Sequence, residues 1–205
     1  MEKNTVVVAT GNAHKLAEIE AILGAAPAMA NMRFVALSDL GDFADPVEDG
    51  DTFTANALIK ARAALDETDV CVAVADDSGL VVDALDGAPG IFSARWAGEH
   101  GDDAANNQKL LTQMQGVADG ERTARFHSSV ALVSRDEDGE EVLVGEGDCE
   151  GCIARDLRGT NGFGYDPLFE LADIPGKRMA ELEPEEKNAI SHRRRALDDL
   201  VSKLG

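Results

Sequence analysis

The residues most suggestive of chemistry lie in a turn near the N-terminus, Thr10-Gly11-Asn12-Ala-His-Lys15. The apolar run Val6–Val8 before it predicts a buried strand, and apolar residues from Leu16 onward have helical spacing. A helix start presents free backbone N–H groups and partial positive charge, so anions bind there. The nearby lysine favours a phosphate ligand, although this is not the Gly-x-x-x-x-Gly-Lys pattern of a Walker A loop. The alternative is an ordinary strand-to-helix turn with a surface lysine.

Two adjacent acids, Asp76 and Asp77, follow the apolar run Val70–Ala75 and precede Ser78. We expect them at the carboxyl end of a strand, where ligands bind in α/β sheets. Successive strand side chains point to opposite faces, so the two acids need not share a role. One can bind Mg²⁺ or orient a water, as carboxylates do with triphosphate substrates. The alternative is a solvated turn that ends the strand.

Asn56 and Lys60 lie one turn apart on a predicted helix, on the face opposite its apolar stripe. Glu48 precedes that helix in the segment Pro46–Gly50. Spacing alone favours a solvated surface for all three residues.

The segment Gly159–Phe169 combines glycines with aromatic residues and includes Phe163, Gly164, Tyr165 and Asp166. Glycine lets a backbone approach a ligand closely, and aromatic rings stack on nucleobases. The alternative is a structural turn whose aromatic side chains fill the core.

A basic segment, Glu185–Arg195, contains Lys187, His192 and Arg193, for which the alternative is a charge-balanced helix start. The chain has seven lysines against twelve arginines. Lys15, Lys60 and Lys187 all fall in segments already singled out on other grounds. Because a strongly acidic protein repels a triphosphate, it needs a local cationic pocket to bind one.

Strands and helices alternate early and strands cluster later, which predicts an α/β fold with a mixed sheet. Strands are expected near residues 5–9, 33–36, 70–75, 80–82, 122–134 and 141–148, and helices near residues 13–23, 52–65 and 102–114. Asp51 or Thr52 is expected to cap the second helix. A final helix carries Ile190, Leu197, Leu200, Val201 and Leu204.

Composition limits the class of protein. The length of 205 residues predicts one domain, and no apolar run approaches the ~20 residues of a membrane span. Because the chain starts without a signal-peptide pattern, a cytoplasmic location is expected. The formal charge of −20 argues against a nucleic-acid partner and indicates a protein adapted to high salt. Cys149 and Cys152 have C-x-x-C spacing, but incidental strand cysteines are favoured over a zinc or redox site.

Together these segments resemble the noncanonical purine NTP pyrophosphatases, also called the inosine triphosphate pyrophosphatase or Ham1-like family. The resemblance runs from Val6 to about Leu197, and six motifs occur in the family's order. They are Thr10-Gly-Asn-x-x-Lys15, Phe53-x-x-Asn56-Ala-x-x-Lys60-Ala, Ala75-Asp-Asp-Ser-Gly-Leu80, Pro89-Gly-Ile-Phe-Ser-Ala-Arg95, Phe163-Gly-Tyr-Asp-Pro167 and Lys187-x-Ala-Ile-Ser-His-Arg193. Each motif is modestly specific alone, whereas all of them in order are very specific.

The resemblance implies an α/β fold in which a mixed twisted sheet with flanking helices forms two lobes around a central cleft. It implies a single domain over residues 1–205, usually in a homodimer. It also implies Mg²⁺-dependent hydrolysis of ITP, dITP and XTP at the α–β phosphoanhydride bond. The products are the nucleoside monophosphate and pyrophosphate, so such enzymes remove deaminated purines from the nucleotide pool.

Site residues follow from the resemblance motif by motif. Asp77 matches the family's proton acceptor, and Glu48 and Asp77 match its metal-associated acids. The matches to substrate contacts are Thr10, Gly11, Asn12 and Lys15 in the triphosphate-binding turn, Lys60 as a further phosphate neighbour, Ser78, the base-side loop Phe163, Gly164, Tyr165 and Asp166, and finally Lys187, His192 and Arg193.

Two other functions stay open on the sequence. A pyrophosphatase for pyrimidine or modified nucleotides, as Maf-like proteins are, would use a related scaffold, although the segments around Phe163 and His192 favour purines. A nucleotide-binding regulator without activity would not need Glu48 and Asp77.

Overall fold

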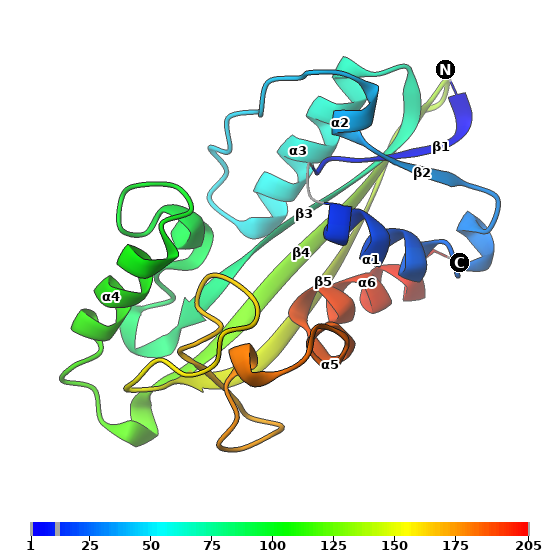
Figure 1. Ribbon diagram of the computed structural model, residues 1–205. Coiled ribbons are helices and arrows are strands. Elements are labelled where there is room, and N and C mark those ends of the chain that lie inside the picture. The colour runs from blue at the N-terminus through cyan, green and yellow to red at the C-terminus, as the bar shows by residue number, and fades with distance from the viewer. Residues whose placement is uncertain (1, 11–12, 205) are drawn as a thin grey trace. The chain divides into compact units, whose positions relative to one another are not determined.

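The computed structural model describes residues 2–10 and 13–204 (Figure 1). Six strands hydrogen-bond in the order β2-β1-β3-β4-β5-β6. Their bounds are β1 Glu2–Val8, β2 Arg33–Ala36, β3 Val70–Val82, β4 Thr123–Asp136, β5 Gly139–Ile153 and β6 Phe169–Leu171. β1 pairs in parallel with β2 and β3, whereas β6 is antiparallel to β5. The predicted mixed sheet is therefore confirmed.

The helices flank this sheet. Their bounds are α1 Ala13–Leu23, α2 Leu37–Leu40, α3 Phe53–Glu67, α4 Asp103–Gln113, α5 Pro184–Ile190 and α6 His192–Ser202, and a 3-10 helix, η3, spans Gly90–Arg95. Thr52 caps α3, since its Oγ1 accepts a hydrogen bond from Ala55 N at 3.0 Å. Within residues 2–10 and 13–204, no helix has both the length and the apolar character needed to cross a bilayer.

The chain divides into two compact units. Unit 1 consists of residues up to Asp77, Ser128–Gly147 and residues from Arg193 onward, and unit 2 consists of Ser78–His127 and Asp148–His192. Strands β3, β4 and β5 each contribute residues to both units. The single domain and the two lobes around a cleft stay predictions.

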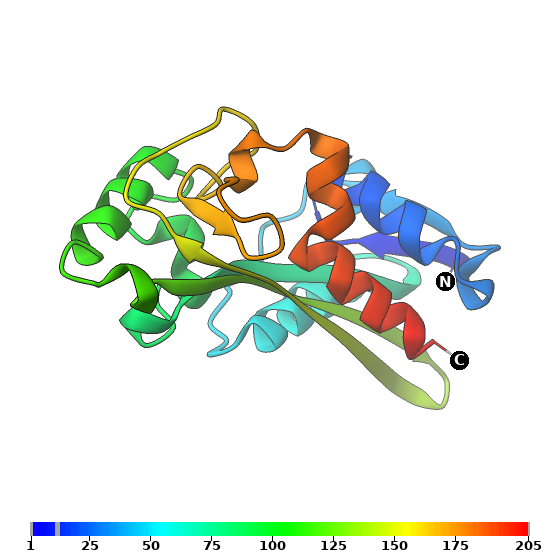
Figure 2. The same cartoon turned by 90° about the horizontal axis from the view of Figure 1, so that it is seen from below.

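In unit 1, helices cover both faces of the sheet (Figure 2). On one face, Ile19 of α1 and Leu197 of α6 pack with Val74 of β3. On the other face, Ala61 of α3 packs with Ala73 and the residues around it. Consecutive residues of β3 therefore face different helices, as the pleat of a strand requires.

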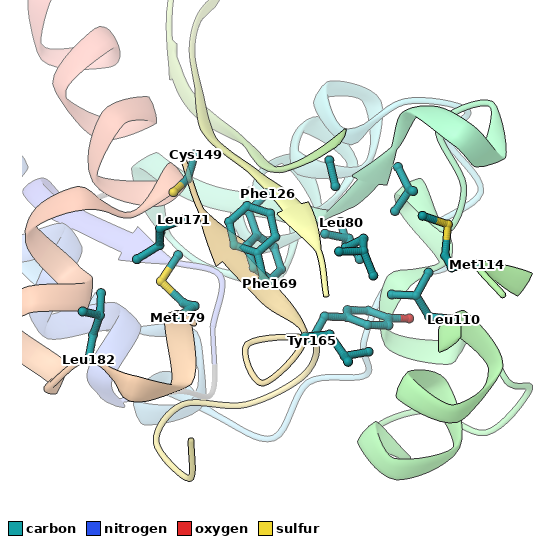
Figure 3. Packing of buried hydrophobic residues seen from close by; sticks show 14 residues of the cluster. Leu80, Leu110, Met114, Phe126, Cys149, Tyr165, Phe169, Leu171, Met179 and Leu182 are labelled. Atoms are coloured by element: carbon teal, nitrogen blue, oxygen red, sulfur yellow. The ribbon is translucent and has the colours of Figure 1, made fainter. Parts of the chain in front are cut away.

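The core of unit 2 is built around Phe126 and Phe169, whose ring centroids lie 4.6 Å apart (Figure 3). Leu110 of α4 and Tyr165 belong to the same buried cluster. Cys149 also lies there and serves as a small apolar side chain.

Two predicted boundaries are wrong. The sequence predicts a loop after Ala75, but β3 continues to Val82, so Asp76 and Asp77 lie inside a strand. The strand can continue because both acids find polar partners on their own faces, as described below. The sequence also predicts one final helix, but Ser191 has an extended backbone (φ −65°, ψ 155°) that separates α5 from α6.

Candidate active site

The carboxylate of Asp77 lies on the α3 side of the sheet in unit 1. Lys60 Nζ is 2.8 Å from Asp77 Oδ1 and 3.6 Å from Glu48 Oε2. Burial raises the pKa of Asp77 and nearby Glu48 adds to the rise, while Lys60 and Asn56 oppose it. A carboxyl group whose pKa is raised toward neutral pH is suited to act as a general base.

Asn56 joins this cluster from α3. Asn56 is fully buried, so the prediction of a solvated position, which the spacing alone favours, is wrong for this residue. Its Nδ2 donates to Asp77 Oδ2 at 3.3 Å, and its Oδ1 accepts from Gly50 N at 2.9 Å. One amide therefore connects Asp77 to the backbone just after Glu48.

Asp76 faces the opposite side of the sheet, toward α1 and α6. It accepts hydrogen bonds from Lys15 Nζ at 3.0 and 3.1 Å and from Arg193 Nε at 3.0 Å. Arg193 Nη1 also lies 3.3 Å from Glu18 Oε2. Burial alone would raise the pKa of Asp76, but Lys15, Arg193 and Lys60 hold it well below its usual range. Asp76 is therefore a buried, permanently charged anchor for two of the predicted substrate contacts.

A hollow of about 470 Å³ in unit 1 adjoins the acid cluster. Thr10, Glu48 and Lys60 line it, together with the segment Gly41–Val47. The remaining residues of the predicted phosphate turn, Gly11 and Asn12, lie outside the described residues.

Unit 2 contains a pocket of about 280 Å³. The predicted site residues that line it are Ser78, Phe163, Gly164, Tyr165, Asp166, Lys187 and His192. Lys187 Nζ lies 4.5 Å from the centroid of the Phe163 ring and forms an ion pair with Asp166. Asp166 Oδ2 also accepts a hydrogen bond from Phe163 N at 2.9 Å. The Phe163 ring, the Lys187 ammonium and the Asp166 carboxylate are therefore in mutual contact at the pocket.

The aromatic residues of this loop have different environments. Phe163 is 64% exposed, whereas Tyr165 and Phe169 are buried, as the core-filling alternative predicts. His192 stacks on Phe126, with ring centroids 5.2 Å apart and an interplanar angle of 21°. Phe163 is therefore the ring of this loop that is open to stack on a ligand.

Across residues 2–10 and 13–204, no group of three or more His, Cys, Asp or Glu side chains is arranged to hold a metal ion. Glu48 and Asp77 nevertheless converge on one cationic group, the ammonium of Lys60. Mg²⁺ in phosphate-transfer sites is commonly held by one or two carboxylates, with waters and substrate phosphates as further ligands. The two acids fit that kind of site.

The model of the Ham1 family matches residues 6–203. The chain belongs to the Ham1 family. It is 49% identical to the dITP/XTP pyrophosphatase of Corynebacterium diphtheriae, over 96% of this chain and 94% of that protein. It is 50% identical to the dITP/XTP pyrophosphatase of Geobacter sulfurreducens, over 98% and 96% respectively.

Solved structures of the Ham1 family are similar over nearly the whole chain. The Ham1 protein of Staphylococcus aureus gives a TM-score of 0.85 at 38% identity, covering 98% of this chain and 97% of that one. A HAM1 protein from Coxiella burnetii gives 0.85 at 42% identity and covers 98% of both chains.

In this Ham1-family chain, sequence reasoning assigns no site role to eight residues that line the pocket of unit 2: Gly79, Leu80, Ser93, Ala94, His100, Gly101, Asp103 and Phe126. From the sequence, Asp103 is only an acidic residue in the first turn of a helix, a position that acids commonly occupy. Ser93 lies in the motif Pro89–Arg95, to which the resemblance assigns no site role. Phe126 resembles an ordinary core residue, and nothing in the pattern around His100 marks it.

Proposed function

We propose that this chain hydrolyses noncanonical purine nucleoside triphosphates, namely ITP, dITP and XTP, to the nucleoside monophosphate and pyrophosphate. The observation that carries the proposal is the cluster of Asp77, Lys60 and Glu48, in which a carboxyl group with a raised pKa lies beside an ammonium and a second acid. The names and near-complete coverage of the curated relatives support the substrate class.

Asp77 acts as the general base in this proposal. It accepts a proton from a water molecule, which attacks the α-phosphorus as pyrophosphate leaves. Glu48 and Asp77 would hold Mg²⁺, which when bound neutralises phosphate oxygens and polarises the phosphorus. Asn56 fixes the orientation of the Asp77 carboxylate through its Nδ2.

Cations of unit 1 stabilise the negative charge that builds up on the leaving pyrophosphate. Lys60 contacts the acid cluster directly, and Lys15 is held by Asp76 on the other face of β3. Fixed charges of this kind need no reorganisation during the reaction, which is why they lower the barrier effectively.

Base recognition is assigned to the pocket of unit 2. Phe163 offers an exposed ring for stacking, and Lys187 and His192 are candidate donors to the 6-oxo group of a deaminated purine. Adenine carries an amino donor at that position, so it would face a donor and be disfavoured. Arg193, a further candidate for this role, belongs to unit 1, where Asp76 and Glu18 engage its guanidinium.

The decisive experiment incubates the protein with ITP and Mg²⁺ and resolves pyrophosphate from orthophosphate. We expect pyrophosphate and IMP from the wild type, and a loss of kcat of about 10²–10⁴-fold in Asp77→Asn, because the base is removed. Binding of ITP should largely survive in this variant. The matched control is Asp119→Asn, since Asp119 is an exposed acid that forms an ion pair with the exposed Arg155.

Other outcomes would change the proposal. Near-normal kcat in Asp77→Asn would remove the role of this residue. Preferential hydrolysis of pyrimidine triphosphates would favour a Maf-like activity, and binding without any pyrophosphate release would favour a regulator.

The proposed dependence on Mg²⁺ is tested separately: activity should be lost with EDTA and recover when Mg²⁺ is added. The homodimer rests on the family resemblance alone, and light scattering after gel filtration would test it.

A further inference from the structure

Helix α4, labelled in Figure 1, carries two polar residues, Asp103 and Asn107, at a spacing of four that places them on one face. Asp103 Oδ2 accepts a hydrogen bond from Gly164 N at 2.7 Å. Asn107 Nδ2 donates to Gly164 O at 2.8 Å. Both polar groups of one backbone residue are therefore held by side chains of a single helix. We call these two side chains the Asp103–Asn107 clamp.

The clamped residue is the centre of the base-side loop. Gly164 has φ +62°, a left-handed conformation that a residue with a Cβ rarely adopts, and it lies between Phe163 and Tyr165. Asn107 is buried, and its Nδ2 also donates to Asp103 O at 2.8 Å, which fixes the orientation of the amide. The clamp thus holds, from a helix, the point of the loop where the backbone is left-handed.

The same helix also holds a second segment that contributes Ser93 and Ala94 to the pocket lining. Asn106 Oδ1 accepts from Ala97 N at 2.7 Å, and its Nδ2 donates to Ala94 O at 3.3 Å. Tyr165 connects the base-side loop to this segment, because its hydroxyl donates to Ser93 O at 2.9 Å. In Figure 3 its ring lies beside Leu110 of α4.

We propose that Asp103 and Asn107 are positioning residues that hold Gly164 and thereby set the pocket that receives the purine base. This inference rests on the proposed function and deepens it, because it says what determines the affinity for the base. The clamp acts through the backbone of Gly164, which carries Phe163 on one side and Tyr165 and Asp166 on the other. A loop released from the clamp would still leave Asp77 and its partners in unit 1 intact.

The test compares Asp103→Ala with Asp103→Asn. The alanine variant removes both the charge and the acceptor for Gly164 N, whereas the asparagine variant removes the charge and keeps an acceptor oxygen. Both variants should fold, because Asp102 caps α4 independently through Ala105 N at 2.9 Å. We expect Asp103→Ala to raise KM for ITP about tenfold or more with kcat within threefold, the sign of lost binding rather than lost chemistry. Asp103→Asn should stay within threefold of the wild type in KM. Asn107→Asp, which keeps the size but loses the donor to Gly164 O, should behave like Asp103→Ala.

A second readout needs no substrate. Tyr165 is the only tyrosine of the chain, so its ionisation can be followed by absorbance near 295 nm. Burial raises the pKa of Tyr165, and the charge of Asp103 adds to the rise. A loosened loop in Asp103→Ala should let Tyr165 ionise at lower pH than in Asp103→Asn, where the same charge is absent.

The outcomes separate the two claims. If the wild type releases no pyrophosphate from ITP, the proposed function fails, and the tyrosine titration alone decides whether the clamp holds the loop. If the wild type is active but Asp103→Ala and Asp103→Asn have the same KM or the same tyrosine titration, the acid serves only the start of α4 and the inference is overturned.

Discussion

Asp76 and Asp77 are neighbours in the chain, but the pleat of β3 places their carboxylates on opposite faces of the sheet. Asp77 meets one ammonium and one amide, and burial raises its pKa. Asp76 meets an ammonium and a guanidinium, which keep it charged. The first arrangement suits proton transfer, whereas the second suits the fixed placement of Lys15 and Arg193.

Asp76→Ala should therefore be strongly destabilising. The substitution leaves Arg193 buried with Glu18 as its remaining described carboxylate partner, and breaking a buried ion pair costs about 3–5 kcal/mol. Urea unfolding at pH 7 measures the loss. Asp198→Ala is the control, because Asp198 pairs with Arg194 on the surface and such pairs contribute about 0–1 kcal/mol. Equal losses in the two variants would show that Asp76 is not an anchor.

At the scale of single residues, the sequence names candidate site residues but not the partners of their side chains. The alternation of side chains along a strand already indicates that Asp76 and Asp77 need not share a role. It cannot predict which cation serves which acid, because Lys15 and Arg193 lie 61 and 117 residues from Asp76 and meet it only through tertiary packing. The burial of Tyr165 depends on tertiary packing in the same way.

At the scale of helices and strands, the sequence pattern predicts an element correctly where the tertiary packing agrees with that pattern. Thr52 caps α3, and the continuous apolar runs Val6–Val8 and Val70–Ala75 mark β1 and β3, which are buried on both faces. The break predicted after Ala75 fails because Asp-Asp-Ser-Gly is typical of a turn only when its acids are solvated. The helix predicted at the C-terminus is interrupted at Ser191 although the apolar spacing continues across it.

The close packing of α6 against Gly145 of β5 gives a prediction about these two elements. A Cβ at Gly145 would lie 2.2 Å from Ala196 O and 2.6 Å from Leu200 N, so the helix leaves no room for a methyl group. Gly145→Ala should lower stability by about 1–3 kcal/mol, as overpacking does, and reduce the melting temperature. Gly116→Ala is the control, since its Cβ would meet open space and should be neutral or slightly stabilising. An unchanged melting temperature for Gly145→Ala would show that α6 can shift without cost.

The whole molecule carries 39 acidic against 19 basic residues, a net charge of −20. Some acids are paired at the surface, as where Arg62 and Arg135 lie 2.8 and 2.9 Å from Glu140. Because the basic residues are outnumbered about two to one, negative charge stays in excess even where such pairs form. Mutual repulsion among them opposes the folded state and is weakened by salt.

We propose, from this charge, that the protein is adapted to high salt, so its stability should rise with salt. The screening length falls from about 10 Å at 0.1 M to about 3 Å at 1 M, so most of the gain should appear before 1 M KCl. Melting temperature and ITP hydrolysis measured from 0.05 to 2 M KCl give the profile.

The control is a variant with Glu137, Glu141 and Glu150 changed to Gln. These exposed acids contribute to the repulsion, so their loss should flatten the salt profile at low salt. Sucrose, which stabilises folded proteins without screening charge, should not distinguish this variant from the wild type. Full stability and activity at 0.05 M KCl, with no gain at higher salt, would show that the acidic surface is tolerated rather than adapted to salt.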